Sequence, residues 1–228
     1  MEQFHRRRGV GAEAATRYSP GPACPTANLN RHFLFAFLGL LICCASYPAA
    51  AASWPAPSVP FYGYATPEKI GGDFELIGSD AAGEHTISLR QYRGKFVLLL
   101  FGFTHCPLTC PTTLSRAAEV VAAMEDRNDL AVIFVTLDPE RDQPGPLNSF
   151  IQSFNKDFIG LSGSAGQIQK VADAYRVSYA KQPWGKSYTI DHSSYIYLLD
   201  RAGQVAFLYP ENEPASHISQ DINNLLRK

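Results

Sequence analysis

Two short apolar runs constrain the fold of this chain more than any other feature. Residues 95–103 read KFVLLLFGF and residues 130–137 read LAVIFVTL. Uninterrupted runs of this length are typical of β-strands that are buried on both faces of a sheet. Between them, apolar side chains recur at helical spacing over residues 114–122. Two buried strands joined by a helix require a parallel crossover, so helices must cover the sheet.

The remaining elements complete an α/β domain. The pattern predicts a hairpin with strands at 74–77 and 85–89, and helices at 147–154 and 164–175. Ser164 and Gln167 form a capping-box signature for the second of these helices. Strands at 192–199 and 205–209 and a helix at 218–226 close the chain. We therefore expect a mixed central sheet with helices on both faces and an N-terminal β-hairpin extension.

The N-terminal part is typical of an export signal. Residues 33–45 (FLFAFLGLLICCA) carry no charge, follow Arg31 and precede small residues, so cleavage is expected near Ala51 or Ala52. The run is shorter than the roughly 20 residues of a membrane helix, so a retained anchor is the less favoured alternative. A translation start at Leu29 would give a leader of ordinary length. We expect residues 1–52 to be the leader, 53–70 an extended lead-in and 71–228 one domain.

Charge and cysteine content narrow the class of function. The chain has 20 basic and 21 acidic residues, and without residues 1–52 its net charge is −4. This balance gives no reason to expect nucleic acid as a partner. Three of the five cysteines leave with the leader, so the exported domain keeps only Cys106 and Cys110. Two cysteines in an oxidising compartment either form a disulfide or bind a soft metal ion.

Cys106 and Cys110 lie in the run HCPLTCP, where the first buried strand ends and a helix begins. The N–H groups and the positive dipole end of a helix N-terminus favour a thiolate over a thiol. Their spacing places both sulfurs on one side of a first helical turn. A disulfide that closes so short a loop stabilises a domain by only about 2 kcal/mol. Redox exchange or soft-metal binding therefore explains the pair better than a structural bridge.

Four histidines of the exported part are available as a further ligand. His85 falls in a hairpin and His217 opens the last helix, so we expect both to be exposed. His105 adjoins Cys106 but faces another direction, and its expected part is to tune the thiolate electrostatically. His192 stands at the start of a late strand that this order of elements can place beside the first crossover. It is therefore the best candidate.

Four motifs of this chain closely resemble the SCO/SenC proteins. They occupy residues 94–114 (GKFVLLLFGFTHCPLTCPTTL), 132–144 (VIFVTLDPERDQP), 158–164 (FIGLSGS) and 191–203 (DHSSYIYLLDRAG). The resemblance implies a thioredoxin-like fold and copper, as Cu(I) or Cu(II), bound by Cys106, Cys110 and His192. It also implies that the protein delivers copper to the binuclear copper centre of cytochrome c oxidase or reduces its cysteines. Independently, two thiolates and an imidazole suit Cu(I) and tolerate Cu(II), and the residue types alone leave zinc open as an alternative.

The residues between the cysteines depart from the family pattern. Many members have CPDxCP, whereas this chain has Leu108 and Thr109 in the spacer, which puts in doubt any contact of the missing carboxylate. Asp138, in LDPERD, matches a family acid near the site. It is a candidate for orienting the ligating side chains without binding the metal itself. Turn formation before Pro139 explains Asp138 equally well.

We expect a periplasmic copper chaperone rather than an enzyme. Its expected partner is the copper-site subunit of cytochrome c oxidase or another cuproprotein, and the membrane only if an uncleaved N-terminal segment tethers the domain. Two alternatives stay open. One is a thiol–disulfide oxidoreductase in which Cys106 and Cys110 are catalytic and cycle through a disulfide. The other is a copper or redox sensor.

Overall fold

The structure is a computed structural model that describes residues 61–65, 69–106 and 109–227. The predicted leader, its cleavage site and its alternative start lie outside these ranges and stay predictions, as does the placement of Leu108. In the part of the chain that is described, we find no helix with the length and hydrophobicity to cross a membrane.

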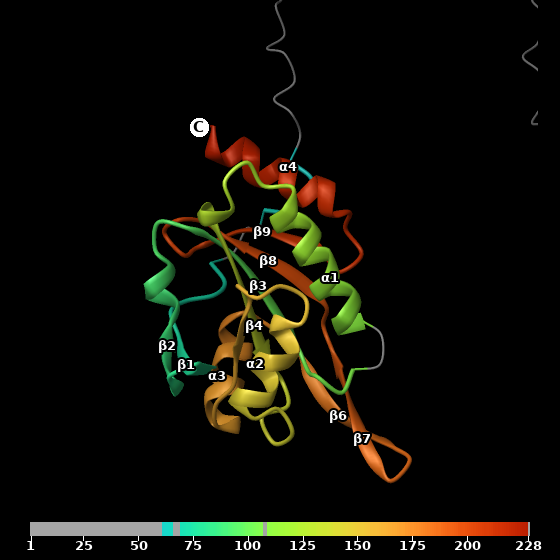
Figure 1. The fold of residues 1–228 in the computed structure, drawn as a ribbon. Coiled ribbons are helices and arrows are strands. Elements are labelled where there is room, and N and C mark those ends of the chain that lie inside the picture. Colours follow the sequence, from blue (N-terminus) through green and yellow to red (C-terminus); the bar gives the residue numbers. More distant parts are fainter. Residues whose placement is uncertain (1–60, 66–68, 107–108, 228) are drawn as a thin grey trace, which may run out of the picture. The chain divides into compact units, whose positions relative to one another are not determined.

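A five-stranded sheet forms the centre of the domain (Figure 1), with its strands in the order β5-β4-β3-β8-β9. Their bounds are Phe96–Gly102 for β3, Leu130–Thr136 for β4, Ile159–Leu161 for β5, Tyr195–Leu199 for β8 and Val205–Pro210 for β9. β3, β4 and β5 are parallel, and β8 is antiparallel to both β3 and β9. The predicted mixed sheet and its parallel crossover are confirmed.

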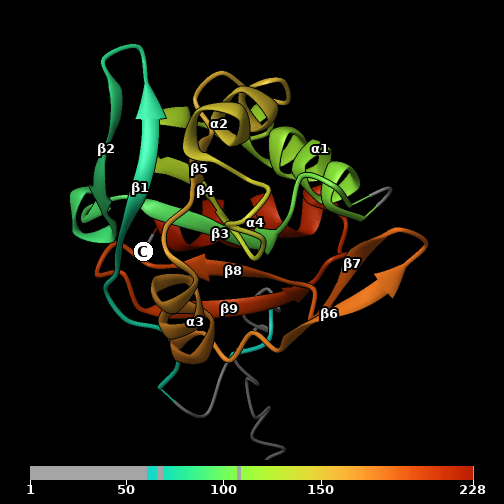
Figure 2. The same cartoon turned by 90° about the horizontal axis from the view of Figure 1, so that it is seen from below.

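Helices cover both faces of this sheet (Figure 2). The helices α1 (Thr109–Ala122), α2 (Pro144–Gln152) and α4 (Ala215–Leu226) contribute to one core, and α3 (Ala165–Ala174) to the other. Successive side chains of a strand point to opposite faces. In β3, Leu98 therefore joins the core under α1 while Val97 and Leu99 join the core under α3. Burial on both faces is the reason that β3 contains no polar side chain.

Both edges of the sheet are covered. The predicted N-terminal hairpin is confirmed as β1 (Glu75–Asp80) and β2 (Gly83–Ser88). Ile77 of β1 exchanges two backbone hydrogen bonds of 2.8 Å with Ser162, just beyond the edge strand β5. At the other edge, Tyr64 exchanges bonds of 2.9 and 3.0 Å with Leu208 of β9. Each bridge pairs one residue at or beside an edge strand, which shortens the open edge at which proteins aggregate.

Asp221 of α4 anchors the segment around Tyr64. Its buried carboxylate accepts hydrogen bonds from the backbone N–H of Tyr62 at 2.8 Å and of Gly63 at 2.9 Å. It also accepts one from the Tyr209 hydroxyl at 3.1 Å. One carboxylate therefore joins residues 62–63, β9 and the last helix.

A second hairpin, β6 (Tyr179–Trp184) with β7 (Ser187–His192), is the largest difference from the predicted fold. The strand predicted at 192–199 is wrong at its start, because His192 ends β7 and β8 begins only at Tyr195. The chain turns between them, where the Ser193 N–H donates to the Ser178 carbonyl at 2.9 Å. Among the described strands, β6 and β7 pair only with each other. The hairpin projects from the body in Figures 1 and 2.

Candidate metal centre

The two cysteines lie where the central strand β3 gives way to α1. Cys110 is in the first turn of α1 and is 3% exposed, whereas Cys106 in the preceding loop is half-buried. The Cys110 sulfur packs directly on Gly102, the last residue of β3. A methyl group placed on Gly102 would lie 2.6 Å from that sulfur. The absence of a side chain at Gly102 therefore makes the room for the buried thiol.

The two sulfurs are close neighbours. The backbone N–H of Cys110 donates to the Cys106 sulfur at 3.4 Å, and no disulfide joins these two residues in the structure. The side-chain hydrogen bond with Cys106, and then burial, raise the pKa of the Cys110 thiol well above its ordinary range. Cys106 is thus the more accessible member of the pair, and Cys110 is the protected one. The predicted disulfide stays a prediction.

Asp142, which the sequence argument does not single out, fixes the loop that carries Cys106. Its carboxylate is buried and accepts the Thr104 N–H at 2.9 Å and the Thr136 hydroxyl at 2.6 Å, and the Thr104 hydroxyl as well. Hydrogen bonds to an ionised carboxylate are stronger than those between neutral groups. The loop from β3 to Cys106 is therefore tied to the end of β4 and to the turn that follows it.

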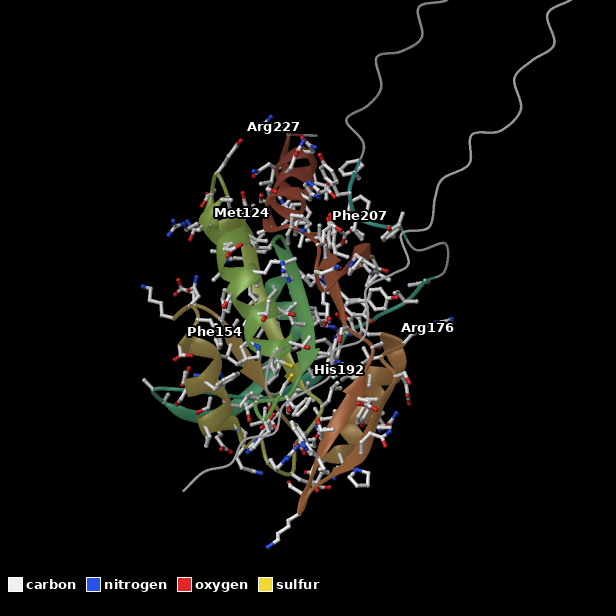
Figure 3. The ribbon with its side chains drawn as sticks, turned by 90° about the vertical axis from the view of Figure 1, so that its right-hand side faces the viewer. Met124, Phe154, Arg176, His192, Phe207 and Arg227 are labelled. Atoms are coloured by element: carbon white, nitrogen blue, oxygen red, sulfur yellow. The ribbon has the colours of Figure 1, made fainter. Side chains whose placement is uncertain are left out.

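His192 approaches the cysteines from the projecting hairpin. Figure 3 shows it where the hairpin meets the body of the domain. His192 lines one pocket with Cys110 and Glu211 and a second pocket with Cys106 and Phe103. Its Nδ1 lies 3.1 Å from the Ser193 carbonyl, which only accepts, so this contact favours the tautomer with the proton on Nδ1. Nε2 is then the lone-pair nitrogen that a metal ion would use.

The side chains of Cys106, Cys110 and His192 are donors that suit a soft metal ion, but they do not converge on one point in the structure. Two sulfurs and one imidazole nitrogen match the preference of Cu(I) for soft, low-coordinate sites. In the described residues, however, no three His, Cys, Asp or Glu side chains converge closely enough to hold an ion. The structure therefore places His192 in one pocket with Cys110 and in a second pocket with Cys106, without assembling the three side chains as ligands.

The side chains around the two cysteines form a small apolar cluster that is separate from the two main cores. Phe103, Cys110 and Ile190 form a separate buried cluster, against which Cys106, Tyr179 and Tyr188 pack. The Phe103 ring meets His192 edge-on with 6.1 Å between the ring centres. A low-polarity wall of this kind limits the access of water to a bound ion.

Asp138 is buried and lies in the turn after β4, where Tyr188 and Arg141 bind it. Its carboxylate accepts the Tyr188 hydroxyl at 2.8 Å and pairs with the Arg141 guanidinium. Asp138 therefore reaches the His192 hairpin rather than a cysteine. Its backbone N–H also donates to the Thr136 hydroxyl at 2.9 Å. Both interpretations of Asp138 stay predictions.

The other histidines lie elsewhere. His105 is exposed and its Nδ1 lies 3.7 Å from Asp142 and 3.0 Å from the Thr104 hydroxyl. His85 lies in β2 and is exposed, as predicted. The prediction of an exposed His217 is wrong. Its side chain is only 35% exposed, because it stacks on Tyr62 at 3.7 Å between ring centres and bonds Glu213 at 2.7 Å.

Two thiols lie at the junction of a central strand and its helix and are faced by a histidine on a hairpin, and this arrangement on a mixed five-stranded sheet defines a thioredoxin-like protein. The SCO1/SenC family model matches residues 63–227. The chain belongs to the SCO1/SenC family.

Relatives and solved structures agree with this assignment. The SCO2-like protein of Rickettsia conorii is 39% identical over 151 residues, covering 64% of this chain and 72% of the relative. ScoI of Bradyrhizobium japonicum, solved with copper bound, is 37% identical with a TM-score of 0.61, covering 68% of this chain and 98% of that one. ScoI of Arabidopsis thaliana with copper bound is 31% identical with a TM-score of 0.64, covering 70% and 99%.

Proposed function

We propose that this protein is an exported copper chaperone that carries copper on Cys106, Cys110 and His192 and delivers it during assembly of cytochrome c oxidase. The observation that carries the proposal is that His192 lines one pocket with Cys110 and another with Cys106. The copper-bound ScoI structures support it from outside the chain. The recipient is the copper-site subunit of the oxidase or another cuproprotein.

Delivery needs a site that opens as readily as it closes. Cys106 is partly accessible, and His192 belongs to a hairpin that pairs with no other described strand. A partner can therefore reach Cys106 and replace His192 without unfolding the central sheet. Periplasmic location, with or without a retained N-terminal anchor, completes the proposal and depends on the leader.

The test is the copper content and affinity of the reduced domain. The wild-type protein should bind one copper ion, Cys106→Ala should lose it, and His192→Ala should bind it far more weakly. His85→Ala is the matched control, because His85 lies on the N-terminal hairpin away from these pockets. Wild-type copper affinity in His192→Ala would contradict the three-ligand proposal.

A thiol–disulfide reductase is the second candidate, and the unequal exposure of the two cysteines favours it. The Cys106 thiolate would attack a partner disulfide, forming a mixed disulfide and releasing one partner thiolate. Cys110, as a thiolate, would then attack the Cys106 sulfur and release the second. The partner gains two electrons, this chain keeps a Cys106–Cys110 disulfide, and an external dithiol must reduce it again. Exchange activity that survives in His192→Ala, with no copper bound by the wild-type protein, would favour this candidate.

A further inference from the structure

The turn between β4 and α2 holds both halves of the proposed copper site. At its end, Asp142 binds Thr104 and so fixes the loop that leads to Cys106. At its start, Asp138 and Arg141 bind Tyr188 of β7, the strand that ends in His192. The turn is itself closed by backbone bonds from Arg141 and Asp142 to the Asp138 carbonyl, at 3.1 and 2.9 Å. One rigid segment therefore sets the position of both sets of ligands.

Tyr188 makes the connection to the hairpin. Its hydroxyl donates to the buried Asp138 carboxylate at 2.8 Å, and the Arg141 guanidinium lies 3.8 Å above its ring. Arg141 also donates to the Tyr188 carbonyl at 3.0 Å. Both oxygens of Asp138 are thereby used, one by Tyr188 and one by Arg141. This contact involves a fully buried charge, so its loss is costly.

The geometry of β7 passes this restraint on to His192. Side chains two residues apart lie on the same face of a strand, so Tyr188, Ile190 and His192 share one face. Ile190 is 4% exposed and packs against Phe103 and Cys110, so this face is the one that covers the cysteines. No described strand outside the hairpin pairs with β7, so side chains rather than backbone bonds dock it.

We propose that Tyr188 is a positioning residue for copper: its docking on Asp138 and Arg141 keeps His192 poised over Cys106 and Cys110. This inference rests on the proposed copper-carrying function. The three candidate ligands do not converge in the described residues, so copper binding requires a rearrangement of the site. Docking at Tyr188 restricts the positions that His192 can take during that rearrangement, and pre-organisation of this kind raises affinity.

The test compares Tyr188→Phe with Tyr175→Phe. Both changes remove one hydrogen-bonded hydroxyl, but the Tyr175 hydroxyl bonds the Gly72 carbonyl at 2.9 Å in the core under α3, away from both pockets of the site. Copper(I) affinity is measured by competition with a chromophoric copper(I) chelator. A hydrogen bond to a buried charge is worth about tenfold in an equilibrium constant, so Tyr188→Phe should weaken copper(I) binding about tenfold. Tyr175→Phe should stay within about twofold of the wild type, because its hydroxyl contacts no part of the site.

Two further readouts separate positioning from general damage. In a His192→Ala background, Tyr188→Phe should cause no additional loss of affinity, because the residue whose position it sets is gone. In the metal-free protein, amide exchange in β6 and β7 should accelerate in Tyr188→Phe while exchange in β3 and β8 stays as in the wild type. The thermal midpoint of the domain reports any wider loss of structure.

Equal or tighter copper(I) binding by Tyr188→Phe would overturn the inference, and so would a full additional loss in the His192→Ala background. If the wild-type protein bound no copper, the proposed function would fail instead. The exchange data would then decide the docking role alone: unchanged hairpin exchange in Tyr188→Phe would refute it.

Discussion

Gly102→Ala should damage the thiol site by steric pressure alone. Gly102 is buried at the end of β3, and its φ angle is not in the left-handed region, so alanine fits the backbone. The new methyl group would lie 2.6 Å from the Cys110 sulfur and 2.9 Å from the Phe134 ring. Both neighbours are buried, Cys110 at 3% and Phe134 at 2% exposed, so displacing either one disturbs the side chains packed around it.

Overpacking of a buried site by one methyl group costs about 1–3 kcal/mol. With a urea m-value of about 2 kcal/mol per molar, the unfolding midpoint of the reduced domain should fall by about 0.5–1.5 M. The same pressure should push Cys110 outward, so alkylation of Cys110 should accelerate relative to Cys106. Urea unfolding and mass spectrometry after timed alkylation measure the two effects.

Gly166→Ala is the matched control. Gly166 lies in α3, and a methyl group placed there meets nothing within 4 Å. Alanine should stabilise this helix by up to about 1 kcal/mol. If Gly102→Ala unfolded at the wild-type urea concentration, with Cys110 still protected, the packing argument for the buried thiol would be refuted.

Three other changes test separate parts of the structure. Asp142→Asn should lower the free energy of unfolding by about 1–3 kcal/mol, since a neutral amide replaces the buried carboxylate that accepts from Thr104. Urea unfolding measures this change. A difference below experimental error would contradict the role given to the Asp142 hydrogen bonds. Ser164→Ala removes the confirmed capping box of α3 and should lower the free energy of unfolding by about 1 kcal/mol in the same assay. An unchanged urea midpoint would contradict this prediction. Burial raises the pKa of Tyr197 to about 12. Its contribution to stability is thus complete below about pH 10 and is lost as the pH rises towards that value. Tyr197→Phe should flatten this alkaline loss of unfolding free energy, and an identical pH profile would contradict the assignment.

The central sheet could be predicted because strands that are buried on both faces leave uninterrupted apolar runs in the sequence. A strand buried on both faces, such as β3, must be apolar at every position, and this pattern marks it. The hairpin β6–β7 carries no such signal, since every residue of β6 after Tyr179 is exposed and Lys181 and Pro183 interrupt its pattern. The strand β5 has three residues, too few to show a period.

The same contrast holds for the site. Cys106 and Cys110 could be predicted from the sequence, because of their residue type and their position where a helix begins. His192 was predicted near them for a partly mistaken reason, because it ends a hairpin strand instead of opening a sheet strand. The parts played by Asp142 and Tyr188 depend on contacts over 38 and 50 residues of chain. Spacing within one motif cannot reveal such contacts, although the acids of LDPERD were a signal for the turn.

Asp221 has a consequence for how the domain opens. Chain ends are usually the first segments to fray and the first to be cut by proteases. Here residues 62–63 and α4 share one buried carboxylate, and Tyr62 stacks on His217 of the same helix. Detaching either segment leaves the other without its hydrogen-bonding or stacking partner. The segment at residues 62–63 and α4 should therefore unfold together as one cooperative unit.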